Sequence, residues 1–287
     1  MVKSIFPRSP QSFISPFLKW VGGKRQLAPI LKDLMPPLSQ IREYVEPFVG
    51  GGGMFFSLQP ERAIINDLNE ELINVYKVIR DTPRDLIECL KTHTNSPEHY
   101  YEVRDLDRQP LFQHLSQVER AARIIFLNKT CFNGLFRVNA QGFFNVPYGY
   151  YKNPQFQEVS KILSVSGYLR SADIRIMSGN YTHVLSHIKA GTFVYLDPPY
   201  APISDTSNFT GYNSGGFSNK EQESLRDFCL KLSELGAFVM LSNSCSPIIY
   251  ELYSGQFNIH EVKVNRAISA AAASRGQVTE LVITNYN

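Results

Sequence analysis

The sequence has few of the features that mark a membrane-spanning or disulfide-linked protein. No apolar run approaches the ~18 residues that cross a bilayer, and Pro7, Pro10 and Pro16 interrupt the amino-terminal stretch where a signal peptide would need one. The 287 residues include four cysteines and no Cys-x-x-Cys pair, so neither a zinc site nor a disulfide framework is expected. These absences predict a cytoplasmic protein with reduced cysteines and no membrane contact.

A strong charge of one sign is also lacking, but the charges are unevenly placed. The net charge is only +3. Residues 1–32 hold six Lys or Arg and residues 120–157 hold five, with no carboxylate in either segment. The rest of the chain holds the other 18 basic residues and all 26 acidic ones. Such segregation is expected of a nucleic-acid groove, although two solvated basic faces would give the same count.

Aromatic and aliphatic residues are plentiful, and their spacing alternates between strand and helix patterns. Hydrophobic residues make up 43% of the chain, which is enough for a large core. Short apolar runs predict strands at 44–45, 63–65, 193–196, 238–241, 259–264 and 280–284, the last two as an antiparallel pair. Helical spacing occurs over 70–91, 118–129 and 221–235, with Pro83 in the first turn of a second helix.

The order of these elements predicts an α/β fold built from both ends of the chain. Residues 1–69 and 158–287 would form one sheet domain, and residues 70–157 a mainly helical insertion. Within the insertion, 132–151 is rich in aromatic residues, Asn and Gly, which suits a hairpin or an extended loop.

A glycine run is the first candidate site. Gly50 to Gly53 follow a predicted strand, and Asp67 ends the next one. Glycines let the backbone approach a ligand, and a carboxylate at that strand tip can accept hydrogen bonds from ribose hydroxyls. A dinucleotide fingerprint would place a third glycine where Phe56 stands, so the loop favours a nucleoside without phosphates, such as S-adenosylmethionine. A tight turn would use the same glycines.

The second candidate site, Asp197-Pro198-Pro199-Tyr200, directly follows an apolar strand and is more specific. The amino group of adenine is a poor nucleophile because its lone pair is delocalised into the ring. Asp197 can accept one of its N–H groups and the carbonyl of Pro198 the other. Tyr200 offers a face on which an extruded base can stack. The motif therefore indicates transfer to an exocyclic amine of a flipped base.

The segment Phe17-Leu18-Lys19-Trp20-Val21-Gly22-Gly23-Lys24-Arg25 adds a third candidate site near the amino terminus. Lys24, behind two glycines, can reach a ligand carboxylate, and Trp20 can cover a purine or a sulfonium. By itself this segment indicates little.

Taken in order, the motifs resemble those of the Dam-type DNA adenine-N6 methyltransferases over essentially the whole chain. The motifs that carry the resemblance are Phe-Leu-Lys-Trp-x-Gly-Gly-Lys, Glu-Pro-Phe-Val-Gly-Gly-Gly, Asn66-Asp67-Leu68-Asn69, Asn133-Gly134-Leu135-x-Arg137-x-Asn139, Phe144-Asn145-Val146-Pro147-Tyr148-Gly149 and Asp-Pro-Pro-Tyr. Within that family the chain is most similar to the duplex-DNA methyltransferases of the DpnII restriction-modification type, which modify GATC.

The resemblance implies a Rossmann-like S-adenosylmethionine-dependent methyltransferase sheet, double-stranded DNA as partner and a functional link to a cognate restriction endonuclease. It also implies roles for individual residues. The catalytic positions are Asp197, Pro198, Pro199 and Tyr200; the cofactor positions are Trp20, Lys24, Phe48, Gly50, Gly52, Asp67 and Asp197; the DNA positions are Lys19, Phe132, Asn133, Leu135, Arg137, Asn139 and Pro147. Tyr150 departs from the family pattern, where a basic residue is frequent, and Lys152 can supply the phosphate contact instead.

Several rival functions stay open beside adenine-N6 methylation. Cytosine-N4 or RNA adenine methylation could use a similar amine-polarising motif, and a DNA-binding protein could keep the fold without turnover. A nicotinamide enzyme is disfavoured by Phe56, and cytosine-C5 chemistry by the absence of a Pro-Cys nucleophile. His183 and His187 lack a third ligand nearby in sequence, so no metal is expected. A serine hydrolase is rejected because Ser242, Ser244 and Ser246 have no His-Asp partners.

Overall fold

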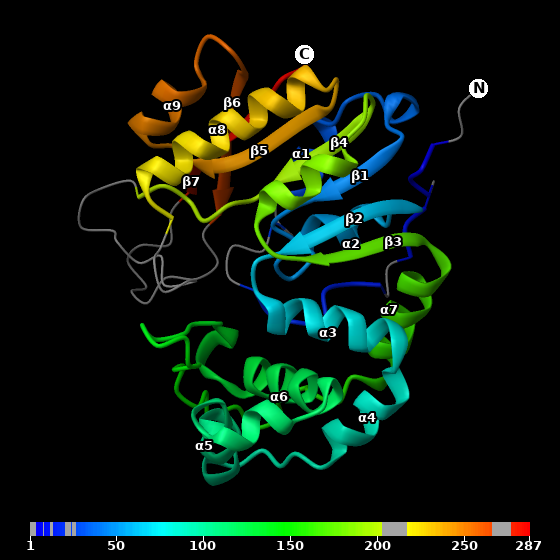
Figure 1. Ribbon diagram of the computed structural model, residues 1–287, viewed down its shortest axis with the longest axis vertical. Helices are drawn as coiled ribbons and strands as arrows, with labels where there is room; N and C mark the ends of the chain where they lie inside the picture. The colour runs from blue at the N-terminus through cyan, green and yellow to red at the C-terminus, as the bar shows by residue number, and fades with distance from the viewer. Residues whose placement is uncertain are drawn as a thin grey trace.

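The computed structural model describes residues 4–7, 9–11, 14–20, 24, 27–202, 217–265 and 277–287. Gly22 and Gly23 of the amino-terminal motif lie outside these ranges. A seven-stranded sheet in the order β3-β2-β1-β4-β5-β7-β6 organises the chain (Figure 1). Its strands are β1 (Glu43–Glu46), β2 (Arg62–Asp67), β3 (Asp173–Ser178), β4 (Thr192–Leu196), β5 (Phe238–Ser244), β6 (Asn258–Asn265) and β7 (Gln277–Thr284).

Strands β1 to β5 are parallel to one another, whereas β7 runs in the opposite direction. Val45 in β1 lies opposite Ile64 in β2 and Val194 in β4, so the apolar strands predicted from sequence meet at the centre of the sheet. β7 runs antiparallel to both β5 and β6, which confirms the predicted terminal pair. The mostly parallel α/β sheet is consistent with the Rossmann-like methyltransferase fold that the sequence predicts.

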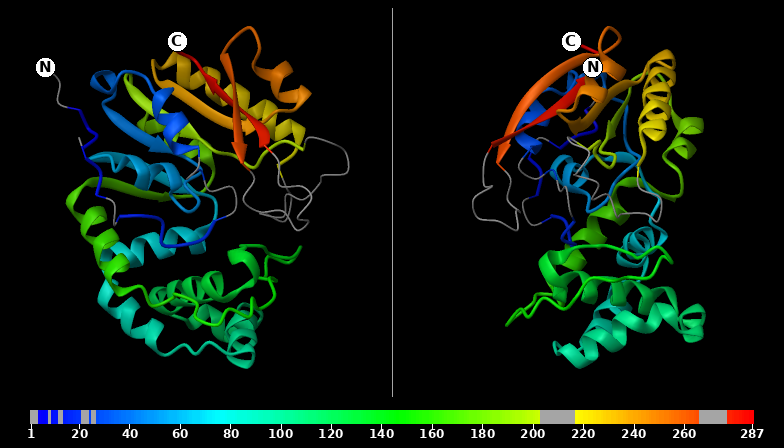
Figure 2. Two further views of the ribbon diagram at one scale, coloured as in Figure 1. Left: turned by 180° about the vertical axis from the view of Figure 1, so that it is seen from behind. Right: turned by 90° about the vertical axis from the view of Figure 1, so that its left-hand side faces the viewer.

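Two hydrophobic clusters cover the two faces of this sheet because successive strand side chains alternate between them. On one face Val45, Val194 and Leu196 pack with α8 (Asn219–Glu234), α9 (Pro247–Tyr253) and the 3₁₀ segment η5 (Tyr181–His187). The right-hand view of Figure 2 shows α8, in yellow, on that side. On the other face Tyr44 and Tyr195 pack with α2 (Gly53–Leu58), α3 (Glu70–Asp81) and α7 (Val159–Ser171).

The helical part of the chain extends from this second face. Helices α4 (Pro83–Lys91), α5 (Pro97–Asp105) and α6 (Gln117–Thr130) group at one end of the molecule, beyond α3 (Figure 1). The same hydrophobic cluster runs from Tyr44 in β1 to Phe126 in α6, so α3 is packed on both sides. The division into domains 1–69 with 158–287 and 70–157 stays a prediction.

The helix starts follow local sequence signals. Pro83 begins α4, as predicted, and Asn69 caps α3 by accepting the Leu72 N–H. Capping boxes begin α6 at Ser116 and α8 at Ser218. The remaining short helix is α1 (Ala28–Asp33). Within the described residues, no helix combines the length and apolar character needed to cross a bilayer.

The segment predicted as a hairpin or loop, 132–151, folds back on itself through two isolated antiparallel bridges, Cys131 with Tyr148 and Val138 with Phe144. It begins with a 3₁₀ turn, η4 (Phe132–Gly134). Both views of Figure 2 show it as a green chain that protrudes from the helical part of the molecule. We call residues 132–152 the arm.

Candidate active site

The carboxyl ends of β1, β2 and β4 bring three acidic residues to one edge of the sheet. Glu46 ends β1, Asp67 ends β2 and Asp197 follows β4. Because β1 lies between β2 and β4, this edge is the topological switch point, where open α/β sheets bind ligands. Burial raises the pKa of Glu46 well above its usual value, and the charges of Asp197 and Asp67 raise it further.

The predicted glycine loop bends around Asp67. Gly50 and Gly52 adopt φ angles of +49° and +73°, which glycine takes without strain. The Gly50 N–H donates to Asp67 Oδ2 at 2.9 Å, and the Asn69 N–H donates to Asp67 Oδ1 at 2.9 Å. Burial raises the pKa of Asp67, and these backbone donors oppose the rise. The carboxylate is thus fixed at the tip of β2 by backbone donors.

The loop also requires glycine because other side chains lie against it. A Cβ atom on Gly50 would lie 2.8 Å from Cδ1 of Trp20, and one on Gly52 would lie 2.6 Å from the hydroxyl of Tyr76. The Tyr76 hydroxyl donates to the Gly50 carbonyl at 3.0 Å. Glycine is therefore required at these positions because Trp20 and Tyr76 pack directly against the loop backbone.

Lys24 and Asp197, from opposite parts of the chain, form an ion pair at the same edge. Lys24 Nζ lies 2.8 Å from Asp197 Oδ1, and the side chains are 6% and 21% exposed. Burial raises the pKa of Asp197, and the charge and hydrogen bond of Lys24 lower it. The ammonium also lies 4.5 Å from the centroid of the Tyr200 ring, in cation–π geometry. The two predicted motifs therefore meet in space.

Residues that the sequence analysis did not single out support this motif. The Tyr200 hydroxyl donates to Glu280 Oε2 in β7 at 2.7 Å. The Pro199 carbonyl accepts from Gln222 in α8, and the Ala201 N–H donates to Asn243 in β5. The periodicity of α8 could have found Gln222, since it shares a helix face with apolar Leu225, Cys229 and Leu232.

Phe48, predicted to contact the cofactor, lies after β1 within an aromatic group. Its ring stacks on Tyr181 at a centroid distance of 5.2 Å and meets Phe217 edge-on at 6.4 Å. Tyr181 belongs to η5, so this 3₁₀ segment helps to form the site. Aromatic faces of this kind suit a purine or a sulfonium.

Most of the residues predicted to contact DNA are exposed on the arm. Phe132 is 51% exposed, which is unusual for phenylalanine. Lys19 reaches the arm from the amino-terminal segment, with Nζ 4.6 Å from the Tyr151 ring centroid. The remaining exposed members of the predicted set are Asn133, Arg137, Pro147 and Lys152, while Leu135 and Asn139 are half-buried.

Two of the predicted side chains make contacts within the arm itself. Asn139 Oδ1 accepts from the backbone N–H groups of Gln141 and Phe143, which stabilises the turn at the tip. Arg137 Nε donates to Asn145 Oδ1 at 2.7 Å. Asn139 thus shapes the arm through its oxygen, whereas Asn145 holds Arg137 mainly through Nε and leaves N–H donors on its Nη atoms that can bind a base edge.

The arm is tied to the amino-terminal segment by Asn128 of α6, which is buried. Its side chain accepts from the Lys19 N–H at 2.8 Å and donates to the Lys19 and Gly134 carbonyls at 2.7 and 3.1 Å. Trp20 stacks on Phe136 with centroids 5.2 Å apart. Trp20 therefore contacts both the arm, through Phe136, and the glycine loop, through Gly50.

Tyr150 is the most exposed of the large hydrophobic side chains of the arm, at 74%, and has a φ angle of +54°. Its ring meets Tyr148 edge-on at 4.9 Å. Lys152 lies two residues further and is exposed.

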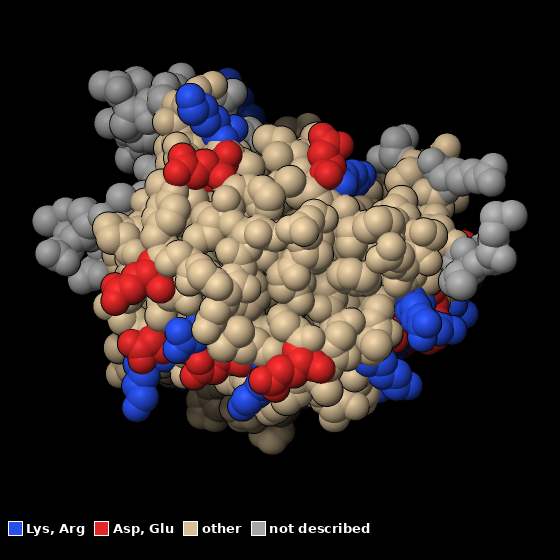
Figure 3. Space-filling model, turned by 90° about the horizontal axis from the view of Figure 1, so that it is seen from above, with Lys and Arg blue, Asp and Glu red and all other residues tan. Residues whose placement is uncertain are grey.

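The charge count from the sequence overstates the positive surface near the arm. Three of the five basic residues in 120–157 form ion pairs: Arg120 with Glu71, Arg123 with Asp107 and Lys129 with Glu158. Arg123 is almost fully buried. Figure 3 shows the opposite end of the molecule, where acidic and basic side chains alternate around the margin. The positive surface of the arm thus depends on Lys19, Arg137 and Lys152.

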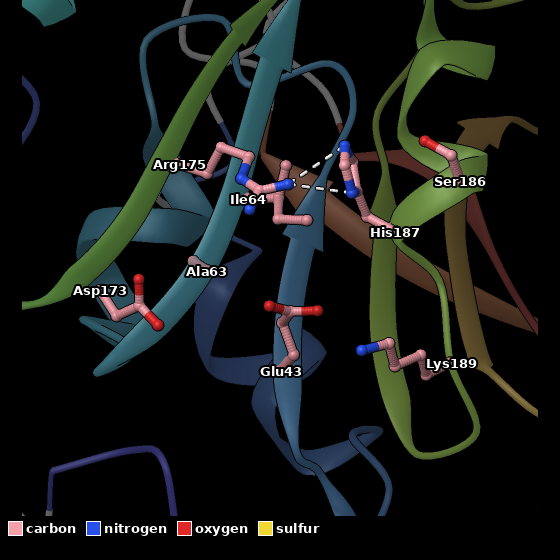
Figure 4. A pocket seen from close by; sticks show the side chains of 8 residues that line it. All are labelled: Glu43, Ala63, Ile64, Asp173, Arg175, Ser186, His187 and Lys189. Atoms are coloured by element: carbon pink, nitrogen blue, oxygen red, sulfur yellow. Dashed lines mark hydrogen bonds between the residues drawn. The ribbon is translucent and has the colours of Figure 1, made fainter.

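A cavity of about 200 Å³ lies elsewhere, at the amino ends of β1, β2 and β3 (Figure 4). Arg175 and Lys189 line it with Glu43, whose pKa is raised by burial. Arg175 Nη1 lies 2.9 Å from His187 Nδ1, while His183 packs against Gly179. No predicted site residue lines this cavity. Within the described ranges, no three His, Cys, Asp or Glu side chains gather as a metal site.

Known proteins resemble the chain along nearly its full length. The family model described as D12 class N6 adenine-specific DNA methyltransferase matches residues 20–268. The Type II methyltransferase M1.LlaDCHI of Lactococcus lactis subsp. cremoris is 48% identical over 275 residues, covering 95% of this chain and 96% of that protein. The Type II methyltransferase M.MjaIII of Methanocaldococcus jannaschii is 40% identical, with coverage of 95% and 99%. The DNA adenine methylase of Vibrio cholerae serotype O1 is 36% identical, with coverage of 93% and 94%.

Proposed function

The chain belongs to the D12 class of N6 adenine-specific DNA methyltransferases, and from this premise we propose that it methylates adenine in duplex GATC with S-adenosylmethionine as the methyl donor. The observation that carries the proposal is the meeting of Lys24, Asp197 and Tyr200 beside the glycine loop and Asp67. The family assignment disfavours the cytosine-N4 and RNA alternatives.

The glycine loop and its neighbours fit the methyl donor. Asp67 would accept hydrogen bonds from the ribose, Gly50 and Gly52 would form the tight turn that places the loop backbone beside the ligand, and Trp20 and Phe48 would cover apolar faces. When bound, S-adenosylmethionine supplies an electrophilic methyl group on a sulfonium. The Lys24 ammonium has three N–H donors, so it can pair with Asp197 and with the carboxylate of a ligand together.

Asp197 and the Pro198 carbonyl would act on the adenine amine. Each can accept one N–H, and both interactions strengthen as the nitrogen gains positive charge during transfer. Because burial raises the pKa of Asp197, its carboxylate is a better proton acceptor than an exposed one. Asp197 would therefore hold the amine and receive the proton that the nitrogen loses. No covalent enzyme intermediate is needed.

Tyr200 would stack on the extruded base, with its ring held by Glu280 and Lys24. The arm would open the duplex and read the sequence. Phe132 is exposed and planar, which suits insertion into a disturbed base stack, and Arg137 can form a bidentate bond to guanine in the major groove. Lys19, Lys152 and Pro147 would lie along the backbone, and Asn133, Leu135 and Asn139 would complete the base-facing surface.

The similarity to named Type II methyltransferases supports a further part of the proposal, that a cognate restriction endonuclease recognises the same site. The proposed relation to the DpnII-type duplex-DNA enzymes predicts the same GATC site.

The test is methylation of defined duplexes by the purified protein. Radiolabelled methyl transfer would be measured on a duplex with one GATC site and on duplexes in which each base pair is replaced in turn, followed by cleavage with GATC endonucleases of opposite methylation sensitivity. We expect transfer to adenine of GATC only, and none by Asp197→Ala. Transfer to other sites would refute the GATC assignment, and normal transfer by Asp197→Ala would refute the catalytic one.

A further inference from the structure

We propose that Gln222 and Asn243 are positioning residues for methyl transfer. Their buried side-chain amides fix the backbone that follows Asp197, and through it the direction of the Pro198 carbonyl. The inference rests on the proposed function, because it takes the Asp197–Tyr200 motif to be catalytic.

The two amides form a chain of hydrogen bonds from α8 and β5 to the motif. Gln222 Nε2 donates to the Pro199 carbonyl at 3.1 Å, and Asn243 Nδ2 donates to Gln222 Oε1 at 3.1 Å. Asn243 Oδ1 accepts from the N–H of Ala201 at 3.0 Å. The hydroxyl of Ser244 donates to the Ala201 carbonyl at 2.7 Å. Polar groups on both sides of Tyr200 are thus held by side chains.

Two consecutive prolines explain why side chains must supply this anchorage. Pro198 and Pro199 have no backbone N–H, so neither residue can be fixed as a donor to the rest of the protein. The Pro199 carbonyl and the N–H and carbonyl of Ala201 are the backbone groups that the network binds. These bonds restrict the rotation of the peptide units around the prolines, which sets where the Pro198 carbonyl points.

Burial makes the network specific to one geometry. Gln222 and Asn243 are both 0% exposed. An amide at such a position is costly unless its donors and acceptor are paired, so a displaced motif would leave several buried groups unsatisfied. Apolar side chains of similar volume would fill the same space but would not fix the conformation of the backbone after Asp197.

The test uses two variants and a matched control. Gln222→Met keeps the length of the side chain and removes both hydrogen bonds, and Asn243→Ala removes the link to Ala201. Leu232→Val alters the buried face of the same helix away from the motif. For each protein we would measure thermal unfolding, the affinities for S-adenosylmethionine and GATC duplex, and the single-turnover rate after the enzyme–duplex complex is mixed with saturating S-adenosylmethionine.

We expect the single-turnover rate of Gln222→Met and Asn243→Ala to fall roughly 10- to 100-fold, because a displacement near 1 Å at a reacting centre costs about that much. Both affinities should stay within about threefold of the wild type, since the binding contacts are retained. Leu232→Val should keep the wild-type rate even where its unfolding temperature falls. A duplex with 2-aminopurine at the target, which lacks the 6-amino group, should show the same fluorescence increase on extrusion in all four proteins.

Two results would overturn the inference. One is a wild-type single-turnover rate in Gln222→Met. The other is a loss of rate in Leu232→Val as large as that in Gln222→Met when the two variants have the same unfolding temperature. If Asn243→Ala does not fold, Gln222→Met decides alone. Asp197→Ala, measured in parallel, separates this inference from the proposed function. Full activity of Asp197→Ala would refute both, whereas an inactive Asp197→Ala with a fully active Gln222→Met would refute the positioning role only.

Discussion

Replacement of Lys24 by Met tests how the buried ion pair controls the carboxylate of Asp197, the proposed catalytic group. Lys24 Nζ lies 2.8 Å from Asp197 Oδ1, and both side chains are largely buried. The cation is the main influence that lowers the pKa of Asp197, whereas burial raises it. Without the cation, burial dominates, so the pKa of Asp197 rises.

The expected size follows from the short distance and the low exposure. An opposite charge within hydrogen-bond distance shifts a carboxyl pKa by about 1–3 units, which corresponds to roughly 1.4–4 kcal/mol. Asp197 must be ionised to accept from the amine. In a plot of rate against pH, the fall in rate at acid pH, the acid limb, should therefore occur about 1–3 pH units higher in Lys24→Met than in the wild type. The loss of rate relative to the wild type should be largest at acid pH.

The assay is the single-turnover rate from pH 5 to 9 with saturating S-adenosylmethionine and duplex, which separates this effect from weaker cofactor binding. Lys24→Arg, which keeps a cation, serves as the control and should retain an acid limb near that of the wild type. An unchanged acid limb in Lys24→Met would refute the reasoning. It would mean that Lys24 does not face Asp197 in the ternary complex.

Three further outcomes are expected. Asp67→Ala should weaken S-adenosylmethionine binding in calorimetry while DNA affinity changes less, and tighter binding of a nicotinamide dinucleotide would contradict the site assignment. Arg137→Ala should lose about 1–3 kcal/mol of discrimination between the correct and a wrong base pair at one position of GATC. Lys152→Ala should instead weaken binding to all sequences alike and reduce the slope of log affinity against log salt concentration by about one. Methylation rates on singly substituted sites at two salt concentrations distinguish the two outcomes. In the folded protein burial and then His99 lower the pKa of His93 from 6.5 to about 4. The native state therefore binds fewer protons at this residue, so between pH 7 and pH 5 the wild type should lose about 2 kcal/mol more stability than His93→Gln does, as measured by urea unfolding; an equal pH dependence in the two proteins would contradict this cause.

The sequence predicts the centre of the sheet well because its strands are apolar on both faces. All five residues of β4 are buried, and such runs are visible without any partner. β3 was not predicted, since this edge strand mixes Asp173 and Arg175 with apolar residues and is only partly buried. Helices α5 and α7 were also not predicted. Both have a weaker amphipathic pattern than α3, and α7 contains four serines and a glycine.

The residues of the candidate site also fall into those that the sequence predicts and those that it does not. Glycine and proline motifs are local signals, so Gly50, Gly52 and the Asp197–Tyr200 turn are visible in the sequence. Glu280 and Asn243 carry no such signal, because a polar residue near the end of a strand looks solvent-exposed until the fold closes over it. Some basic residues look available for DNA in the sequence but are paired within the folded protein. Arg123 and Lys129 count toward a positive segment in the sequence, yet their charges are used in ion pairs within the protein.

The junction at Lys19 and Trp20 decides which variants can report on DNA contacts alone. Lys19 lies on Gly134 and Tyr151 of the arm, whereas Trp20 lies against Gly50 of the glycine loop. Adjacent residues therefore face the two proposed binding sites, and Asn128 holds the backbone of Lys19 through both its N–H and its carbonyl. A substitution at Lys19 or Asn128 changes the surroundings of both proposed ligands. It is therefore expected to change the affinity for DNA and the affinity for the methyl donor together. Arg137 and Lys152 contact neither the glycine loop nor Asp197 within the described structure, so under the proposed function a change at either one would report on recognition of DNA separately from the chemistry.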